Sequence, residues 1–311
     1  MKAVILGGGG FIGSAVSDRL ILDGHAVRIF ERPRVAPYRE FKTTEPVEWA
    51  TGDMLSPHDL DLAIDGMDVV VHLVSSTLPK NSNEDAIFDV QSNLVATLQL
   101  LNAMVSGKVR RIVFISSGGT VYGMPKYVPI DEKHPTTPLV SYGIIKLAIE
   151  KYLLLYERMY GIRTTILRVS NAYGERQRVE TAQGAVNVFL HRALQGQDIE
   201  IWGDGSATRD FIHVRDVAES FARALQYDGG EAILNISSGI GISLNQLVRM
   251  LEESLGRRIE RHYLPGRPFD VPVSVLSNGL AEKELGWVPK VELRDGIRLT
   301  AEWIQRTLGR S

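Results

Sequence analysis

The sequence predicts an α/β protein with a doubly wound parallel sheet, followed by a smaller lobe. Three observations predict this fold. Short β-branched runs alternate with stretches of helical periodicity up to about residue 170, these runs are apolar on both faces, and a glycine-rich turn joins the first run to the first helix. Strands of this kind are parallel, because the segments between them are long enough to form crossover helices.

The elements follow from these patterns in chain order. The predicted strands are residues 2–7, 26–31, 47–53, 68–74, 111–117 and 164–170. The predicted helices among them are Phe11–Leu22, Pro57–Ile64, Ile87–Met104 and Tyr142–Met159. After about residue 171 come a helix at Val186–Leu194, a strand at 233–237 and a helix at Leu244–Leu255. We therefore expect a sheet domain over residues 1–170 and a smaller lobe over residues 171–311, interleaved with the first near the sheet edge.

Composition narrows the class of protein. The 311 residues carry a formal net charge of −2 and no long basic run, which disfavours nucleic-acid and membrane partners. The chain has no cysteine, which excludes disulfides, thiolate metal ligands and thiol nucleophiles, and we assign no metal site. The first residues enter a strand at once and leave no room for a secretory signal, so we expect a cytoplasmic protein.

The turn after the first strand has the spacing of a dinucleotide-binding motif. Gly7, Gly10 and Gly13 lie three residues apart between a predicted strand and a predicted helix. Glycine there permits a tight turn and a close approach of the backbone to a pyrophosphate, which then meets the free amides at the helix N-terminus. In this context the motif indicates a Rossmann-type nucleotide fold rather than a flexible turn.

Two carboxylates end the next strands. Glu31 ends the second strand, where it can accept hydrogen bonds from ribose hydroxyls and would repel a 2′-phosphate, so NAD is favoured. Arg32 and Arg34 follow at once, and arginines here would suit a 2′-phosphate, so NADP stays possible. Asp53 ends the third strand, where it can meet the adenine edge or simply cap a turn.

A tyrosine and a lysine lie four residues apart at the start of the helix predicted for residues 142–159. Tyr142 and Lys146 therefore share one face of that helix. A free tyrosine has a pKa of about 10 and is a poor base at neutral pH. We expect the neighbouring ammonium, together with a nicotinamide cation, to stabilise the phenolate and lower the pKa of Tyr142.

These motifs occur in an order that resembles the extended short-chain dehydrogenase/reductase family. The resemblance is strongest to nucleotide-sugar 4-epimerases of the UDP-galactose type and runs nearly end to end. The segments that carry it include GGGGFIG, HLVSS, SSGGTVYG, YGIIK, LRVSNAYG, GDGSATRDFIHVRDVA, GRPFD and KELGWVPKVELRDGI.

The resemblance implies a reaction. In that family a hydride passes from sugar C4 to oxidised nicotinamide while a tyrosine takes the O4 proton, and both return after the 4-keto sugar has rotated. It implies that Tyr142 is the base and that Lys146 tunes it. It assigns the cofactor contacts to Gly7, Gly10, Phe11, Ile12, Gly13, Glu31, Arg32, Asp53, Met54, Leu73, Val74, Ser75, Asn93, Ser116, Tyr142 and Lys146.

The family also places a serine or threonine near the tyrosine, and this chain departs from that pattern. The position is occupied by Gly118. We expect Ser117 to supply the hydroxyl, because the two glycines after it let the backbone turn at the strand end. Ser116 has the right parity but lies further back along the strand, and Thr120 is a further candidate. Direct proton handling by Tyr142 alone also remains open.

The smaller lobe resembles the family's nucleotide-sugar clamp. The resemblance assigns substrate contacts to Asn171, Arg209, Arg267, Asp270 and Ser274. Guanidinium groups suit a diphosphate, because their paired donors match its oxygens. Phe269 replaces a glycine of the family pattern beside Asp270. Serine at 274 leaves room for an N-acetyl group at sugar C2, so both plain hexoses and N-acetylhexosamines fit.

We expect a 4-epimerase of a UDP-hexose or UDP-N-acetylhexosamine. Dehydration and decarboxylation are disfavoured, because the GlyGlyThr segment at 118–120 offers no carboxylate. An NADPH-dependent reductase of a nucleotide-linked 4-keto sugar is the main alternative, and a non-catalytic cofactor-sensing regulator is a third. The resemblance further implies a homodimer formed through the helices predicted for residues 87–104 and 142–159, and a setting in surface-polysaccharide synthesis.

Overall fold

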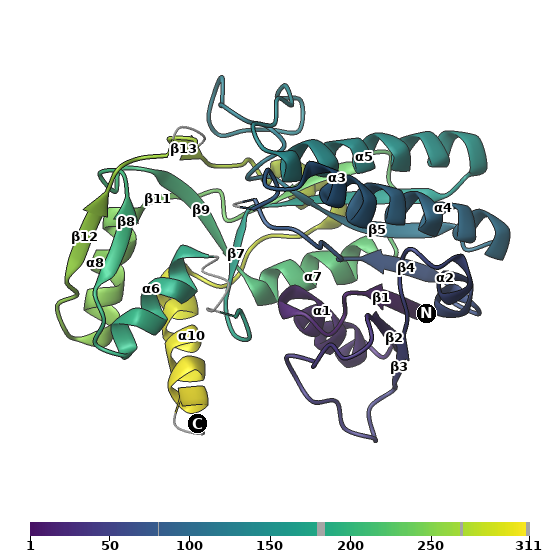
Figure 1. The fold of residues 1–311 in the computed structure, drawn as a ribbon, viewed down its shortest axis with the longest axis horizontal. Coiled ribbons are helices and arrows are strands. Elements are labelled where there is room, and N and C mark those ends of the chain that lie inside the picture. Colours follow the sequence, from purple (N-terminus) through teal and green to yellow (C-terminus); the bar gives the residue numbers. More distant parts are fainter. Residues whose placement is uncertain (80, 179–183, 268–269, 309–311) are drawn as a thin grey trace.

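The computed structural model describes residues 1–79, 81–178, 184–267 and 270–308. A large lobe holds a parallel sheet between two layers of helices, and a smaller lobe lies beside it (Figure 1). Among the described residues, no helix combines the length and the hydropathy needed to cross a lipid bilayer.

The central sheet has seven strands, all parallel. Its order is β3 (Val47–Thr51), β2 (Ala26–Glu31), β1 (Lys2–Leu6), β4 (Val69–His72), β5 (Arg111–Ser117), β6 (Arg163–Val169) and β10 (Ile233–Ile236). The chain runs outward from β1 in one direction and from β4 in the other, so the crevice between these two strands is the topological switch point where ligands bind in such sheets. The predicted doubly wound sheet is confirmed.

Each strand is apolar on both faces because each face has its own helical layer. Ala3 and Ile5 join a core formed with α1 (Phe11–Leu22), α7 (Val214–Ala224) and α9 (Gly279–Leu285). Val4 and Leu6 point the opposite way, into a core formed with α2 (Pro57–Ile64), α4 (Ala96–Gly107) and α5 (Ser141–Tyr160). This alternation is what a doubly covered strand requires.

The helix predicted for residues 87–104 is present but interrupted. It consists of α3 (Ala86–Asp89), a π-helical turn η1 (Val90–Val95) and α4. A π-turn adds a residue to one turn and often marks a functional position. It contains Asn93, whose side chain faces the end of β4.

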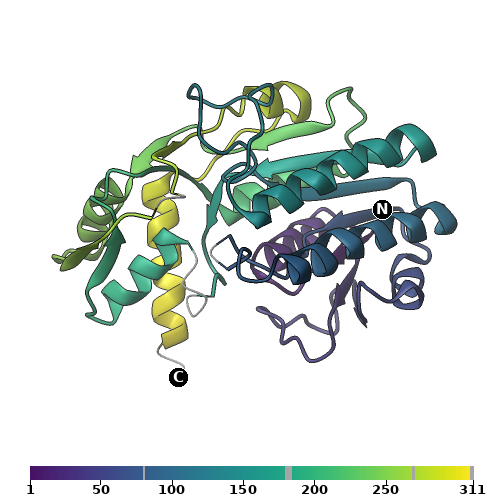
Figure 2. The ribbon, with the colours of Figure 1, turned by 45° about the horizontal axis from the view of Figure 1, so that its top comes forward.

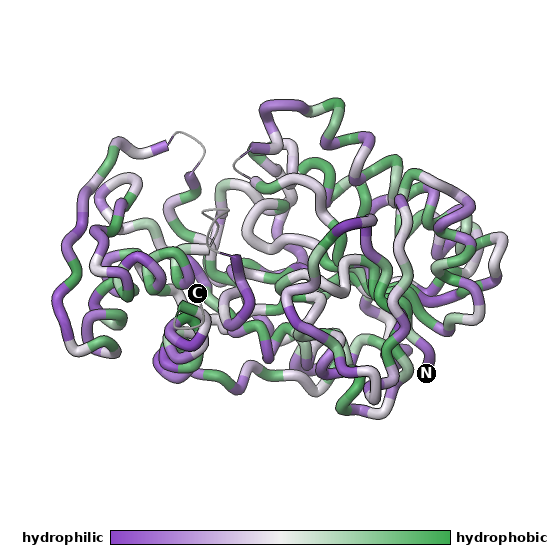
Figure 3. The backbone as a smooth tube through the Cα atoms, turned by 60° about the horizontal axis from the view of Figure 1, so that its bottom comes forward, coloured by the Kyte–Doolittle hydropathy of each residue, from purple (hydrophilic) through white to green (hydrophobic). Residues whose placement is uncertain are grey.

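The smaller lobe has its own core. Helices α6 (Ala185–Leu194), α8 (Leu244–Leu255) and α10 (Leu293–Leu308) pack around short strands, and its outer edge is mainly hydrophilic (Figure 3). The strands are β7 (Asn171–Tyr173), β8 (Ile199–Trp202), β9 (Thr208–His213), β11 (Gly241–Ser243), β12 (Arg261–Leu264) and β13 (Val273–Ser274). Strand β9 is central, because it pairs with β7, β11 and β13.

The predicted division at residue 170 does not separate two continuous units. Helix α7 packs on α1, and β10 extends the central sheet beside β6, so both lie in the large lobe although they follow residue 171. The interleaving that the sequence indicated is therefore extensive. Buried Asp210 on β9 stitches the lobes together by accepting hydrogen bonds from the backbone of Ser238, Gly239 and Leu276.

Candidate active site

The glycine turn forms the expected phosphate cradle at the carboxyl end of β1. Gly7 has a left-handed φ of 83°, and a Cβ added to Gly13 would lie 2.0 Å from the carbonyl oxygen of Gly7. Gly10 is the N-cap of α1 and contributes no side-chain cap, which leaves first-turn amides for an anion. Phe11 and Ile12 begin this helix and are partly exposed. The turn thus fits a dinucleotide pyrophosphate.

The carboxylate of Glu31 lies against this turn, as predicted. Its Oε1 accepts a hydrogen bond from the amide of Gly9 at 3.0 Å, and burial raises the pKa of Glu31 against that hydrogen bond. Arg32 is exposed. Asp53 accepts from the amide of Leu55 at 2.9 Å and so serves a turn, which is one of its two predicted roles. Met54 is buried beside it.

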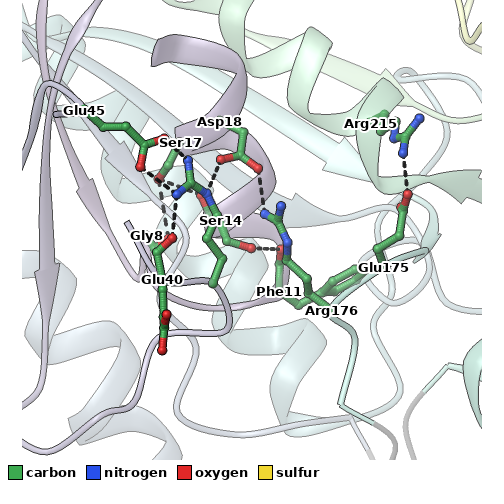
Figure 4. Close-up of polar contacts among 12 residues, drawn as sticks. Gly8, Phe11, Ser14, Ser17, Asp18, Glu40, Glu45, Glu175, Arg176 and Arg215 are labelled. Carbon is green, nitrogen blue, oxygen red and sulfur yellow. Dashed lines mark hydrogen bonds and ion pairs between the residues drawn. The ribbon is translucent and has the colours of Figure 1, made fainter. Parts of the chain in front are cut away.

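Ion pairs fasten the surroundings of the cradle. Arg176, in the segment after β7, reaches Asp18 on α1 at 2.7 Å (Figure 4). Arg39 pairs with the same aspartate at 2.5 Å and also with Glu45, in the loop after β2. These ion pairs join the loop after β2, helix α1 and the segment after β7.

The end of β4 forms the next wall of the site. Leu73, Val74 and Ser75 are all partly exposed, and a Cβ on Gly7 would lie 3.3 Å from the amide of Val74. The side chain of Asn93, which was predicted to contact the cofactor, forms hydrogen bonds with other protein groups. Its Oδ1 accepts from the amide of Ser76 at 2.8 Å and its Nδ2 donates to Asp89 at 2.9 Å, so the side chain is turned inward and supports the wall.

Tyr142 and Lys146 lie together on the first turns of α5. The ammonium of Lys146 is buried, donates to the carbonyl oxygen of Ile115 at 3.0 Å and lies 5.6 Å from the centre of the Tyr142 ring. It is also 4.7 Å from the centre of the Phe114 ring. The end of β5 thus receives the lysine that the helix presents, and the predicted pair is assembled next to the switch point.

The protein groups by themselves raise the pKa of Tyr142, whereas the predicted lowering also counts the charge of a nicotinamide cation. Burial raises the pKa of Tyr142 to about 12, a hydrogen bond with Ser75 opposes this, and the charge of Asp89 adds to it. Burial also lowers the pKa of Lys146 to about 8, against the charges of Glu150 and Asp89. Desolvation is the largest cause of both shifts. Lowering the pKa of Tyr142 therefore requires a further positive charge.

The strand end separates the candidate hydroxyls. Ser116 is turned into the interior, where its Oγ donates to Glu150 at 2.5 Å, so the predicted cofactor contact would fall to its backbone. Ser117 is partly exposed at the end of β5. Thr120 has a buried Oγ1 that lacks a hydrogen-bond partner among the described residues. Both Ser117 and Thr120 remain candidates for a hydroxyl that acts on substrate.

Steric packing explains why residue 118 is a glycine. A Cβ at this position would lie 2.3 Å from Cδ1 of Leu276, which belongs to a small core with Val121, Tyr122 and Ile130. A serine or threonine here would therefore point at that core. The family's usual hydroxyl position is closed by packing in this chain.

The predicted clamp residues gather around β9. Arg209 and Ser274 face each other in the register of β9 and β13, and Arg267 pairs with Asp270 at 3.1 Å. Burial lowers the pKa of Arg209, the charge of Asp270 raises it, and that of Arg267 lowers it. Two guanidiniums beside one carboxylate leave a net positive charge that suits a diphosphate.

The remaining clamp residues complete this picture. Asn171, at the start of β7, donates to the carbonyl oxygen of Asp210 at 3.1 Å. Ser274 is buried beside the clamp. Phe269, whose effect on the loop was in question, lies outside the described residues. The guanidinium of Arg267 also covers Trp202, 4.9 Å from the ring centre, a contact that sequence reasoning missed because β8 and the segment at 267 are distant in the chain.

The histidines near the site have structural contacts. His72 contacts Thr97 at 2.9 Å, and burial followed by the charge of Lys146 lowers its pKa to about 3. It is therefore neutral throughout the physiological range. His213 is the N-cap of α7 and accepts from the amide of Arg215.

The doubly wound sheet, the glycine cradle and the Tyr142–Lys146 pair define a dinucleotide-dependent enzyme of the short-chain dehydrogenase/reductase class. The chain belongs to the NAD dependent epimerase/dehydratase family, whose model matches residues 3–237.

Similar proteins agree with this class. The chain is 34% identical over 310 residues to a UDP-glucose 4-epimerase from Mycolicibacterium smegmatis, covering 98% of this chain and 99% of the relative. A dTDP-4-dehydro-6-deoxyglucose reductase from Escherichia coli is 30% identical over 310 residues, covering 94% of this chain and 94% of the relative.

Two solved structures are also similar. A UDP-glucose 4-epimerase from Thermotoga maritima with UDP-glucose has a TM-score of 0.94 at 32% identity, covering 99% of this chain and 100% of that one. A UDP-glucose 4-epimerase from Thermus thermophilus in complex with NAD has a TM-score of 0.90 at 32% identity, covering 98% and 99%.

The closed position at Gly118 generates a prediction. Gly118→Ser should lower the free energy of unfolding by about 1–3 kcal/mol, because its Cβ meets Leu276 in a packed core. Gly119→Ser is the matched control, since a Cβ there has nothing within 4 Å. Chemical denaturation of the two variants measures the difference. Equal stability of both would show that the strand end adapts and would remove the steric explanation.

Proposed function

We propose that the protein is an NAD-dependent 4-epimerase of a UDP-hexose or a UDP-N-acetylhexosamine, acting through a transient 4-keto sugar. The observation that carries this proposal is the placement of Tyr142 and Lys146 at the switch point of the sheet, with the positive clamp on β9 in the adjoining lobe. The similarity to UDP-glucose 4-epimerases over nearly the whole chain supports it.

NAD fits the residues that are present. The glycine cradle and the open N-terminus of α1 would hold its pyrophosphate, and Glu31 would meet the adenosine ribose once it exchanges its hydrogen bond to Gly9. Lys146 would hold the nicotinamide ribose. Bound NAD supplies a hydride acceptor and, in its oxidised form, a positive charge.

The chain itself handles the proton. Tyr142 would take the proton from sugar O4 as the hydride leaves C4, and would return it when the hydride comes back to the opposite face of the 4-keto sugar. Burial keeps Tyr142 protonated in the protein by itself, so the charge of the oxidised cofactor would decide when it becomes a base. Lys146, whose ammonium lies 5.6 Å from the centre of the Tyr142 ring, would add a second positive charge that favours the phenolate.

The clamp would hold the substrate by its diphosphate and leave the sugar free to turn. Arg209 and Arg267 can each give paired, charge-assisted hydrogen bonds to phosphate oxygens, and Asp270 can accept from a ribose hydroxyl. Binding the nucleotide firmly and the sugar loosely is what a rotation of the 4-keto intermediate needs. Serine at 274 does not obstruct an N-acetyl group.

A 4-keto-sugar reductase is the second candidate, since one relative carries that name. It would use the same Tyr142 and Lys146 and would consume NADPH. Exposed Arg32 could serve its 2′-phosphate, whereas Glu31 against the glycine cradle would oppose it.

The test is to denature the purified protein, identify any released dinucleotide, and assay UDP- and dTDP-sugars for C4 inversion. We expect released NAD and inversion of a UDP-sugar without added reductant. Tyr142→Phe should lower kcat by about 10²–10⁴-fold, because it removes the proton acceptor. Tyr160→Phe, at the far end of the same helix, is the control and should retain activity. Stoichiometric consumption of NADPH without inversion would identify a reductase.

The hydroxyl near sugar O4 can be assigned by two variants. We expect Ser117→Ala to lower kcat by about tenfold or more with little change in KM, because a partly exposed hydroxyl at the strand end is available to substrate. Thr120→Val, which keeps the shape of a buried side chain, is the comparison. Loss of kcat in Thr120→Val alone would transfer the role to Thr120, and activity in both would leave Tyr142 to act by itself.

The proposed enzyme would work as a homodimer in the cytoplasm, in polysaccharide synthesis. Helices α3, α4 and α5 lie side by side on one surface (Figure 2). This surface exposes apolar side chains, namely Ile87, Phe88, Val90, Val95, Ile144, Tyr152, Leu155 and Met159. Exposed apolar side chains on neighbouring helices favour burial against a second copy.

A single charge should disrupt this interface. Leu155→Arg is expected to shift the protein from dimer to monomer in sedimentation velocity, because it places a charge in the centre of an apolar contact. Leu22→Arg is the control, since Leu22 is 78% exposed on α1 and outside this surface. A dimer that survives Leu155→Arg, or a wild-type monomer, would contradict the proposed interface.

A further inference from the structure

Asp89 is a buried carboxylate that the chemistry above does not use. It is fully buried at the end of α3. Its Oδ1 accepts from Oγ1 of Thr77 at 2.6 Å and from Nδ2 of Asn93 at 2.9 Å, and its Oδ2 accepts from Oγ of Ser141 at 2.6 Å. Because both oxygens act as acceptors, the geometry suits the ionised carboxylate.

These contacts lie at the N-terminus of α5, in the turn that carries Tyr142. The N-cap of this helix is Val140, which has no side chain that can cap. Its first amides are satisfied from another segment: Asn83 accepts from the amide of Ser141 at 2.8 Å, and Ser82 from that of Tyr142 at 3.0 Å. The first turn of α5 is thus held by the segment between β4 and α3 rather than by its own cap.

Asp89 differs from the other titratable groups near Tyr142 and Lys146. Glu150 on α5 is paired with Arg168 on β6 at 2.6 Å, and His72 on β4 is neutral. Asp89 meets hydroxyl and amide donors, and it forms no ion pair within the described part of the chain.

Its charge therefore acts on the pair, whereas the charge of Glu150 is offset by Arg168. Burial is the largest cause of the raised pKa of Tyr142. A hydrogen bond with Ser75 opposes this shift, and the charge of Asp89 adds to it. Burial lowers the pKa of Lys146, and the charges of Glu150 and then Asp89 oppose this lowering.

We propose that Asp89 is a positioning residue: it clamps the first turn of α5 to the segment after β4, and its charge keeps the protons on Tyr142 and Lys146. This inference rests on the proposed function. It implies that Tyr142 becomes a base only while an oxidised nicotinamide is bound, so the phenolate is confined to the state that can accept a hydride.

Asp89→Asn tests the charge, because it preserves size and removes the negative charge. Two titrations of the purified protein report on the pair without substrate. The phenolate absorbance of Tyr142 is read against the same protein carrying Tyr142→Phe, and the Cε signal of Lys146 is followed by NMR in ¹³C-lysine-labelled protein, assigned with Lys146→Arg.

Both midpoints should move to lower pH, by about half a unit to one unit, in Asp89→Asn. A merely loosened helix gives a different signature: relief of burial would lower the midpoint of Tyr142 but raise that of Lys146. A midpoint of Lys146 that stays or rises would overturn the proposal. Because neither readout needs turnover, this failure is distinct from a failure of the proposed epimerase activity.

Ser141→Ala tests the clamp while keeping the charge. It removes the hydrogen bond to Oδ2 of Asp89, so amide exchange over Ser141–Gly143 should accelerate by about fivefold or more while both titration midpoints stay in place. Unchanged exchange would overturn the clamp. This variant also carries the test if Asp89→Asn fails to fold.

Discussion

The buried ammonium of Lys146 is the contact on which the rest of the site depends. It donates to the carbonyl oxygen of Ile115, near the end of β5, and so fixes the register of α5 against the central sheet. One turn further along the helix, the carboxylate of Glu150 accepts hydrogen bonds from Ser116 on the same strand and from Arg168 on β6. Tyr142 is therefore carried on a helix that is tied at two levels to the strands whose ends form the site.

The same strands connect the pair to the substrate lobe. Arg168 donates to the hydroxyl of Tyr122 at 3.0 Å, which in turn donates to Asn235 on β10 at 2.7 Å. Strand β10 leads through Ser238 to Asp210 on β9, beside the clamp arginine Arg209. Polar contacts and the chain segment from Asn235 to Ser238 thus connect the helix that carries Tyr142 to Arg209. In the proposed function, this connection sets the position of the clamp relative to the tyrosine.

Local patterns predicted several elements of both lobes well. Helices α1, α2 and α8 begin and end where periodicity placed them, and Gly7, Gly10 and Gly13 form the expected cradle, because these features depend on neighbours in the chain. Contacts between distant segments could not be predicted in this way. Examples are the turn of Ser116 toward Glu150, the clash of Leu276 with a side chain at 118, and the return of α7 and β10 to the large lobe.

The pKa of Tyr142 is the instructive case. The sequence places an ammonium one turn away, which indicates a lowered pKa, but it cannot reveal how completely both groups are desolvated or that the ammonium is held by a strand carbonyl. The protein groups alone raise this pKa, so the predicted lowering depends on the second expected charge, that of the oxidised cofactor. The Tyr142–Lys146 pair was predictable, whereas its electrostatic balance was not.

The most direct measurement of this account is the pH at which Tyr142 ionises in the protein loaded with NAD⁺ compared with NADH, read as phenolate absorbance against Tyr142→Phe. The account predicts a midpoint at least about one unit lower with NAD⁺, because only the oxidised ring is cationic. Equal midpoints in the two loaded forms would contradict it.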